Sequence, residues 1–145
     1  MPFPSDLPAP LLLALAERGY AEPTPVQAAV LAADTAGRDL LVSAQTGSGK
    51  TVAYGLAMAS NLLGTAERLP PAGTPLALVI APTRELALQV SDSFQSFADH
   101  IDGVSILPIY GGQAYGIQLS GLRRGAQVIV GTPGRVIDHL EKGSL

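Results

Sequence analysis

The residues best suited to chemistry form a short glycine-rich segment that ends in a lysine and a threonine. It reads Ala44, Gln45, Thr46, Gly47, Ser48, Gly49, Lys50 and Thr51. Glycines let consecutive backbone N–H groups converge on a phosphate, and a helix that follows presents the positive end of its dipole. In such a loop the lysine reaches the β- and γ-phosphates and the hydroxyl binds Mg²⁺. We therefore predict a nucleotide site with Lys50 and Thr51 as catalytic residues and Thr51 as the metal ligand.

The loop departs from the usual pattern at one position, because Ala44 stands where the pattern begins with glycine. Its later glycines, lysine and threonine are all kept. The only lysines of the chain are Lys50 and Lys142, so a lysine in this loop is not a by-product of a lysine-rich sequence. The alternative interpretation is an ordinary glycine-rich turn with a solvated lysine. The loop by itself also fits a kinase, a GTPase, a transporter ATPase or a helicase.

A tyrosine and a glutamine lie upstream of this loop, in the segment from Gly19 to Gln27. A glutamine amide both donates and accepts hydrogen bonds, so Gln27 matches the N6/N7 edge of adenine, and Tyr20 is able to stack on the base. This pair predicts selection of ATP over GTP. For Gln27 alone, a solvated residue at a helix start is the simpler interpretation. Its position before a phosphate-binding loop favours the adenine site.

Two helix starts share one design and indicate a second site. In each, a threonine stands at the N-cap position and an arginine lies in the first turn, where a cation opposes the helix dipole unless it meets an anion. Both follow strands whose carboxyl ends share one edge of a parallel sheet, where α/β folds place ligands. We expect this edge to bind a nucleic-acid phosphate backbone, although either arginine alone fits a surface salt bridge equally well. The predicted residues are Pro82, Thr83, Arg84, Gly111, Gly112, Thr132, Pro133, Gly134 and Arg135.

The elements that position these residues alternate between strands and helices. Apolar runs predict strands at 39–44, 77–81, 104–110 and 126–131, and helical spacing predicts helices at 51–63, 85–97 and 114–122. Three of the runs are nearly all apolar, which is typical of parallel strands covered on both faces. We therefore predict an α/β fold in which helices sandwich a parallel sheet. Helices at 8–18 and 25–33 precede the first strand as an appended cap, and 64–75, rich in Pro and Gly, is a loop.

Composition limits the kinds of protein that fit. Hydrophobic residues make up 47% and charged residues 14% of the 145 residues, which favours one well-packed domain over disorder. No apolar run approaches the roughly 18 residues that a membrane span needs. The chain has no cysteine, which excludes disulfides and makes the cytoplasm the default compartment. The net charge of −3 means that any contact with nucleic acid must be local.

In this order, the motifs resemble those of the first RecA-like domain of the DEAD-box RNA helicases, with the bacterial members most similar. They are the glutamine motif (Gly19 to Gln27, with Phe3 as upstream aromatic), motif I (Ala44 to Thr51), Pro-Thr-Arg-Glu-Leu-Ala (Pro82 to Ala87), the double glycine (Gly111, Gly112) and Thr-Pro-Gly-Arg (Thr132 to Arg135). The resemblance implies a RecA-like P-loop fold that takes ATP and Mg²⁺. It also implies adenine recognition by Gln27 with Tyr20 stacking, phosphate binding by Lys50 and Mg²⁺ coordination through Thr51. RNA backbone contacts are implied for Arg84, Gly112, Thr132 and Arg135.

The resemblance also implies motifs that the 145 residues lack, namely Asp-Glu-Ala-Asp and Ser-Ala-Thr. In the family the first Asp holds Mg²⁺ and the Glu positions the attacking water, while a second RecA-like domain supplies arginine fingers and half of the RNA site. We therefore expect a partial domain over 1–145, with a cap at 1–33 and a P-loop core at 39–145, truncated before the DEAD-motif strand. Such a piece would not hydrolyse ATP by itself, because phosphoryl transfer depends on positioning. Its unpaired strand edges would invite aggregation or pairing with another chain.

Two other functions stay open. One is a non-catalytic nucleotide- or RNA-binding module, and the other is a different P-loop NTPase such as a small kinase. The arginine-bearing motifs argue against the kinase, which has no use for them. Sequence past Leu145 would distinguish the helicase from the non-catalytic module.

Overall fold

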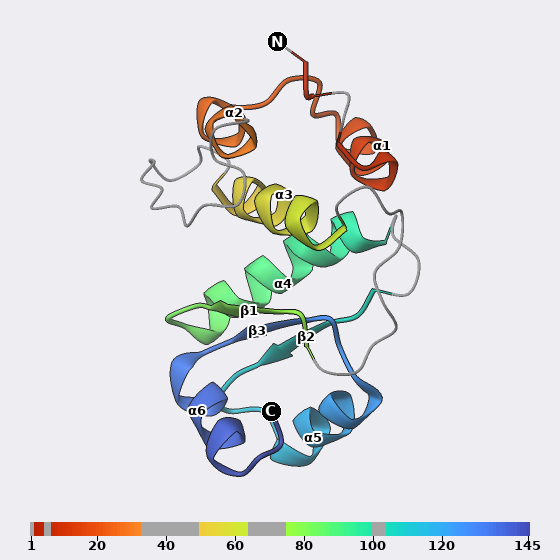
Figure 1. The fold of residues 1–145 in the computed structure, drawn as a ribbon. Coiled ribbons are helices and arrows are strands. Elements are labelled where there is room, and N and C mark those ends of the chain that lie inside the picture. Colours follow the sequence, from red (N-terminus) through yellow and green to blue (C-terminus); the bar gives the residue numbers. More distant parts are fainter. Residues whose placement is uncertain (1, 5–6, 33–49, 64–74, 100–103) are drawn as a thin grey trace.

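The computed structural model of the chain describes residues 2–4, 7–32, 50–63, 75–99 and 104–145 (Figure 1). The predicted strand at 39–44, the part of the phosphate loop from Ala44 to Gly49 and most of the predicted loop at 64–75 lie outside the described residues. No helix in the described part is long and apolar enough to cross a membrane.

Helices and strands alternate along the described chain, as the apolar pattern predicts. The elements are α1 (Ala9–Glu17), α2 (Pro25–Leu31), α3 (Lys50–Leu63), β1 (Ala77–Ile80), α4 (Arg84–Ala98), β2 (Ile106–Ile109), α5 (Tyr115–Arg124), β3 (Val128–Gly131) and α6 (Pro133–Glu141). The predicted helices and strands that fall on described residues are confirmed, with ends that move by about two residues at most.

The strands form a parallel sheet in the order β1-β3-β2. On β3, Val128 pairs with Ala77 of β1 and Ile106 of β2, and Gly131 pairs with Ile80 and Ile109. This register brings the carboxyl ends of all three strands to one edge. The loops that carry the predicted nucleic-acid residues therefore start side by side.

Helices cover both faces of the sheet, with α4 on one face and α5 and α6 on the other (Figure 1). The fully covered environment expected from the apolar runs holds for β3, whose four residues are all buried. It does not hold for β1, where Leu78 and Ile80 are 49% and 51% exposed while Ala77 and Val79 pack toward α4. Among the described residues β1 is an edge strand, and α5 and α6 lie under the other two strands (Figure 1).

The two N-terminal helices pack on the core rather than standing apart from it. Leu11 and Leu15 of α1 join Leu56 of α3 and Phe97 of α4 in one buried cluster. A second cluster joins α2 to α3 through side chains that include Val26, Val30 and Ala53. The segment predicted as a cap is thus fixed against the helix that begins at Lys50, and its division from the core at 33–39 stays a prediction.

Candidate nucleotide site and nucleic-acid interface

The described part of the nucleotide site begins at the first turn of α3. The helix starts at Lys50, directly after the glycine-rich loop, and no acidic residue lies in its first turn. Lys50 and Thr51 are both half-buried, and the next residues, Val52 and Ala53, anchor the helix in the core. A helix start with a lysine, a hydroxyl and the positive end of the helix dipole fits a polyphosphate, and a threonine oxygen fits Mg²⁺.

Gln27 is buried and helps to begin α2. Thr24 is the N-cap, where its hydroxyl accepts from the Gln27 amide at 3.5 Å while the Gln27 Oε1 accepts from the Thr24 amide at 3.0 Å. This capping box fixes the side chain, so the interpretation of Gln27 as a solvated residue is wrong. Because α2 packs on α3, Gln27 lies on the helix next to the one that starts at Lys50. Adenine recognition stays a prediction.

The two predicted aromatic residues share a cavity. Phe3 and Tyr20 line a space of about 430 Å³ whose other walls are Pro2, Leu12, Leu15, Ala16, Gly19 and Ala21. Phe3 is also part of the buried cluster around α1, whereas Tyr20 is 37% exposed and faces the Arg18 guanidinium at 5.5 Å from the ring centroid. The structure therefore joins Phe3 to Tyr20, and Gln27 is not among the residues that line this cavity.

At the carboxyl edge of the sheet, the first helix start has the predicted geometry. Thr83 caps α4, and its Oγ1 accepts from the Leu86 amide at 3.2 Å. Arg84 is the first residue of the helix, and its exposed guanidinium is 3.7 Å from the Glu85 carboxylate. Arg84 Nη1 also lies 3.2 Å from the position that a Cβ on Gly112 would occupy. The loops after β1 and β2 thus touch over the end of the sheet.

The second helix start differs in its cap. Thr132 is the N-cap residue of α6 with Pro133 as the first helical residue, but the Thr132 side chain makes no capping hydrogen bond. Its backbone N–H donates to Ile109 O at 2.9 Å, which ties this start to the end of β2. The expectation of a threonine at the N-cap position is confirmed for both helices, while only Thr83 caps through its side chain.

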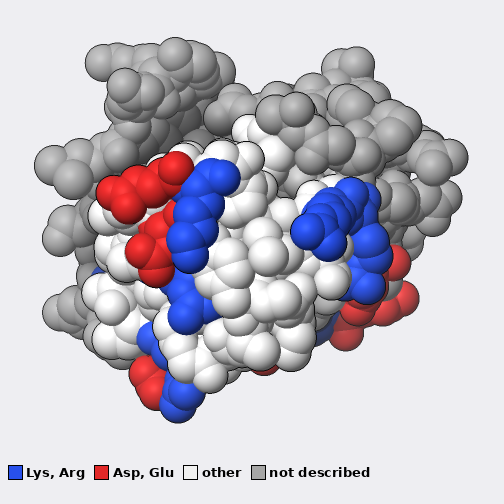
Figure 2. Space-filling view, turned by 90° about the horizontal axis from the view of Figure 1, so that it is seen from below, with Lys and Arg blue, Asp and Glu red and all other residues white. Residues whose placement is uncertain are grey.

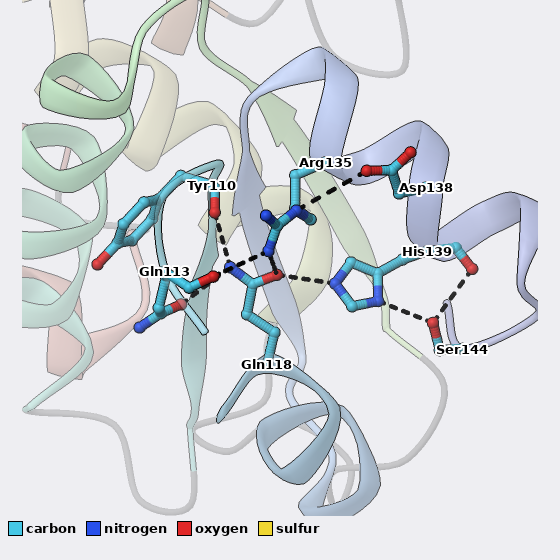
Figure 3. Close-up of polar contacts among 7 residues, drawn as sticks. All are labelled: Tyr110, Gln113, Gln118, Arg135, Asp138, His139 and Ser144. Atoms are coloured by element: carbon cyan, nitrogen blue, oxygen red, sulfur yellow. Dashed lines mark hydrogen bonds and ion pairs between the residues drawn. The ribbon is translucent and has the colours of Figure 1, made fainter. Parts of the chain in front are cut away.

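Arg135 lies in a polar network that joins α5, α6 and the double-glycine turn (Figure 3). It is largely buried, with 17% of its side chain exposed, and its Nη1 donates to Gln118 Oε1 at 3.0 Å and to Gln113 O at 3.1 Å. Its Nε is 3.9 Å from the Asp138 carboxylate. These contacts offset part of the cost of a cation at a helix start. The ion pair with Asp138 fits the salt-bridge interpretation in part, although Arg135 itself is mostly buried, and the RNA contact stays a prediction.

His139 closes the network on the side of α6. Its Nε2 is 2.8 Å from Gln118 Oε1, which also accepts a hydrogen bond from Arg135. Because this oxygen is an acceptor, Nε2 carries the proton, and Nδ1 accepts from the Ser144 hydroxyl at 2.7 Å. The Tyr115 ring stacks on the imidazole, with centroids 4.4 Å apart. Burial, and then the nearby charge of Arg135, lower the pKa of His139 below 6.5; Asp138 opposes this and Lys142 adds to it.

Sequence reasoning missed this network. Gln118 and His139 are both fully buried, although glutamine is mostly exposed in proteins and histidine is intermediate. A signal existed for Gln118, because it lies three residues after Tyr115 and three before Gly121, on the face of α5 that packs under the sheet. A polar residue on a packed helix face indicates a buried hydrogen-bond partner.

Charges on the underside of the molecule are grouped and mixed. Figure 2 shows lysine and arginine side chains in separate groups on this face, with acidic side chains beside them and uncharged surface between. The described part of this face shows no continuous basic field, which agrees with the net charge of −3. A contact with nucleic acid on this face would have to use individual cations.

Comparison with known proteins places these sites in a family. The family model described as DEAD/DEAH box helicase matches residues 24–145. The ATP-dependent RNA helicase DeaD of Mycobacterium tuberculosis (strain H37Rv) is 50% identical over 135 residues, which cover 93% of this chain and 23% of that protein. The protein of the same name from Escherichia coli K12 is 48% identical over 139 residues, which cover 96% of this chain and 21% of that protein. The chain therefore spans less than a quarter of the length of these relatives.

Solved structures agree with the fold. A hypothetical ATP-dependent RNA helicase from Sulfolobus tokodaii is 31% identical with a TM-score of 0.79, over 94% of this chain and 37% of that one. The RNA-helicase Prp28 from Chaetomium thermophilum, bound to ADP, is 38% identical with a TM-score of 0.81, over 97% of this chain and 34% of that one. The parallel sheet between helices is accordingly RecA-like. Because the family model matches most of its length, this chain belongs to the DEAD/DEAH box helicase family.

Proposed function

We propose that the chain is the ATP-binding and RNA-binding part of an ATP-dependent RNA helicase. The observation that carries this proposal is the convergence of the loops after β1, β2 and β3 at one edge of the sheet, where Arg84 lies against Gly112 and Arg135 is bonded to Gln113. Family membership, and relatives that are named RNA helicases, support the same function.

The nucleotide would be ATP with Mg²⁺. The positive end of α3 and Lys50 would hold the phosphates, Thr51 would contribute one oxygen to the metal, and Gln27 with Phe3 and Tyr20 would contact the base. ATP supplies the phosphoanhydride whose hydrolysis drives remodelling. The described helix start suits this role, since it offers donors and a cation and has no acidic residue in its first turn.

RNA would be bound through its phosphates, with little regard to sequence. The edge presents guanidinium groups, threonine hydroxyls and backbone N–H groups, which are typical contacts to phosphate and sugar. Nearly sequence-independent binding suits an enzyme that acts on many RNAs.

Hydrolysis and unwinding would require more than these residues. The 145 residues contain no Asp-Glu-Ala-Asp motif and no second RecA-like domain, so the groups that activate water and complete the RNA site must come from elsewhere. We infer that the 145 residues by themselves bind without turnover, and that the full-length protein is a helicase of the cytoplasm.

The test is RNA binding by the full-length protein with a non-hydrolysable ATP analogue, measured by fluorescence anisotropy with two unrelated single-stranded RNAs over a salt series. Arg84→Met should weaken binding equally for both RNAs and reduce the salt slope by roughly 0.7, the value for one phosphate contact. Arg123→Met is the matched control, because Arg123 is an exposed arginine in the last turn of α5, away from this edge. Equal behaviour of the two variants would refute the RNA site.

A further inference from the structure

Gln118 is a buried carboxamide whose hydrogen-bonding capacity is filled (Figure 3). Its Nε2 donates to Tyr110 O at 2.8 Å and to Gln113 Oε1 at 2.9 Å. Its Oε1 accepts from Arg135 Nη1 at 3.0 Å and faces His139 Nε2 at 2.8 Å. Two donors and two acceptor sites are all that an amide has, so its orientation is fixed by four separate partners.

These four partners come from two parts of the proposed RNA site. Tyr110 and Gln113 flank the Gly111-Gly112 turn, and Arg135 and His139 lie on α6. We propose that Gln118 is a positioning residue that holds the double-glycine turn and Arg135 in the one arrangement that meets the RNA backbone. This inference rests on the proposed RNA-binding function.

The turn needs such a restraint because of its composition. Gly112 has φ of +91°, and consecutive glycines lose more conformational freedom on ordering than other residues do. One Gln118 side chain bonds the residues on both sides of the pair, so the turn is held at its two ends. The N–H groups of the turn are then presented in a fixed direction without an ordering cost when RNA arrives.

Arg135 is oriented by the same amide. Nη1 donates to Gln118 and Gln113, which holds one edge of the guanidinium toward the protein. No hydrogen bond to Nη2 is found among the described residues, and this nitrogen is therefore the one to meet a phosphate. Replacing Gln118 with an apolar residue would free Arg135 to rotate and leave Tyr110 O without its amide donor.

A purely structural role would also bury Gln118, so the test needs a matched buried glutamine. Gln127 is 1% exposed and its Oε1 accepts from the Ser105 amide at 2.8 Å, but it precedes β3, at the opposite end of the sheet. The variants Gln118→Met and Gln127→Met remove the same chemistry at equal burial. Both should lower the melting temperature of the full-length protein.

RNA binding should separate the two variants. RNA anisotropy is measured with a non-hydrolysable ATP analogue. Gln118→Met and Arg135→Met should each bind RNA roughly tenfold more weakly and with a shallower salt slope, while Gln127→Met should match the parent. ATP-analogue affinity should be unchanged in both. The Gln118→Met/Arg135→Met double variant should lose less RNA affinity than the two single losses added together, since part of the first change acts through the second residue and part through the double-glycine turn.

A second substitution serves if the methionine variant does not fold. Gln118→Glu keeps size and the acceptor for Arg135 but cannot donate to Tyr110 O, so RNA affinity should fall while the salt slope stays close to that of the parent. Parent-like RNA affinity in folded Gln118→Met or in Gln118→Glu, or an equal loss in Gln127→Met, would overturn the positioning role. If Arg135→Met binds RNA as the parent does, the proposed RNA contact itself fails.

Discussion

The double glycine offers a sharp test, because its two members differ in backbone conformation and in the space around an added Cβ. Gly112 has φ of +91°, and a Cβ there would lie 3.2 Å from Arg84 Nη1, whereas Gly111 has no positive φ and its Cβ would meet nothing within 4 Å. An L-residue held at left-handed φ costs about 1–2 kcal/mol. The contact with Arg84 adds little to stability, because the far end of a flexible side chain moves easily, but it displaces the guanidinium that is proposed to meet RNA.

We therefore expect Gly112→Ala to lower the melting temperature of the domain in the full-length protein by roughly 2–4 °C for each kcal/mol of stability lost to backbone strain. The same variant should weaken RNA binding. Gly111→Ala, its neighbour, should leave the melting temperature close to that of the parent. Differential scanning fluorimetry and RNA anisotropy on the two variants measure this difference. If Gly111→Ala and Gly112→Ala lose equal stability, or if Gly112→Ala keeps full RNA affinity, the reasoning from backbone strain and from the Arg84 contact is refuted.

Other expected outcomes concern the nucleotide site and pH. Lys50→Ala in the full-length protein should lower ATP turnover by about a hundredfold or more, whereas Lys142→Ala, a lysine at the end of α6, should not; normal turnover in both would make the loop structural. Gln27→Ala should lose any preference for ATP over GTP in nucleotide titrations, and an unchanged preference would show that Gln27 does not contact the base. The depressed pKa of His139 favours its neutral form in the fold, so its contribution to stability is complete above pH 6.5 and is lost as pH falls from there toward the folded pKa. Unfolding of the parent and of His139→Gln, followed from about pH 7.5 to 5, should show a steeper loss for the parent, and parallel curves would contradict this.

The sequence was sufficient for the order of elements and for the edge at which the motifs meet. Apolar runs of five to seven residues, separated by stretches with helical spacing, are buried most simply as the strands of a parallel sheet. Parallel strands bring Arg84, Gly112 and Thr132 to one edge whatever their separation along the chain. The exposure of Leu78 and Ile80 was not predictable in this way. An apolar run indicates that a strand favours burial. Whether each face of the strand is covered depends on the helices and strands that pack against it.

The side-chain partners of Arg135 could not be predicted from the sequence. The dipole rule predicted that Arg135 must meet an anion, but two carbonyl oxygens and the Asp138 carboxylate satisfy much of that need inside the fold. The rule treats an arginine as a charge at a position on a helix, whereas the guanidinium reaches several residues beyond its backbone. Gln118, which lies 17 positions away in the chain, becomes its partner only because α5 and α6 cover the same face of the sheet.

The two arginines therefore contribute to the proposed RNA site in different ways. Arg84 has 53% of its side chain exposed and its salt bridge to Glu85, at 3.7 Å, is of the solvent-screened kind that contributes little. Arg135 is held by Gln118 and Gln113 and is mostly buried, so it loses less conformational entropy when it binds a phosphate. A flexible exposed cation favours capture of RNA from solution, and a fixed cation favours one geometry of the captured backbone. Because β3 lies between β1 and β2, the start of α6 that carries Arg135 is central to the edge, whereas Arg84 follows β1 at one side of it. The fixed contact is thus at the middle of the proposed site and the adaptable one at its rim.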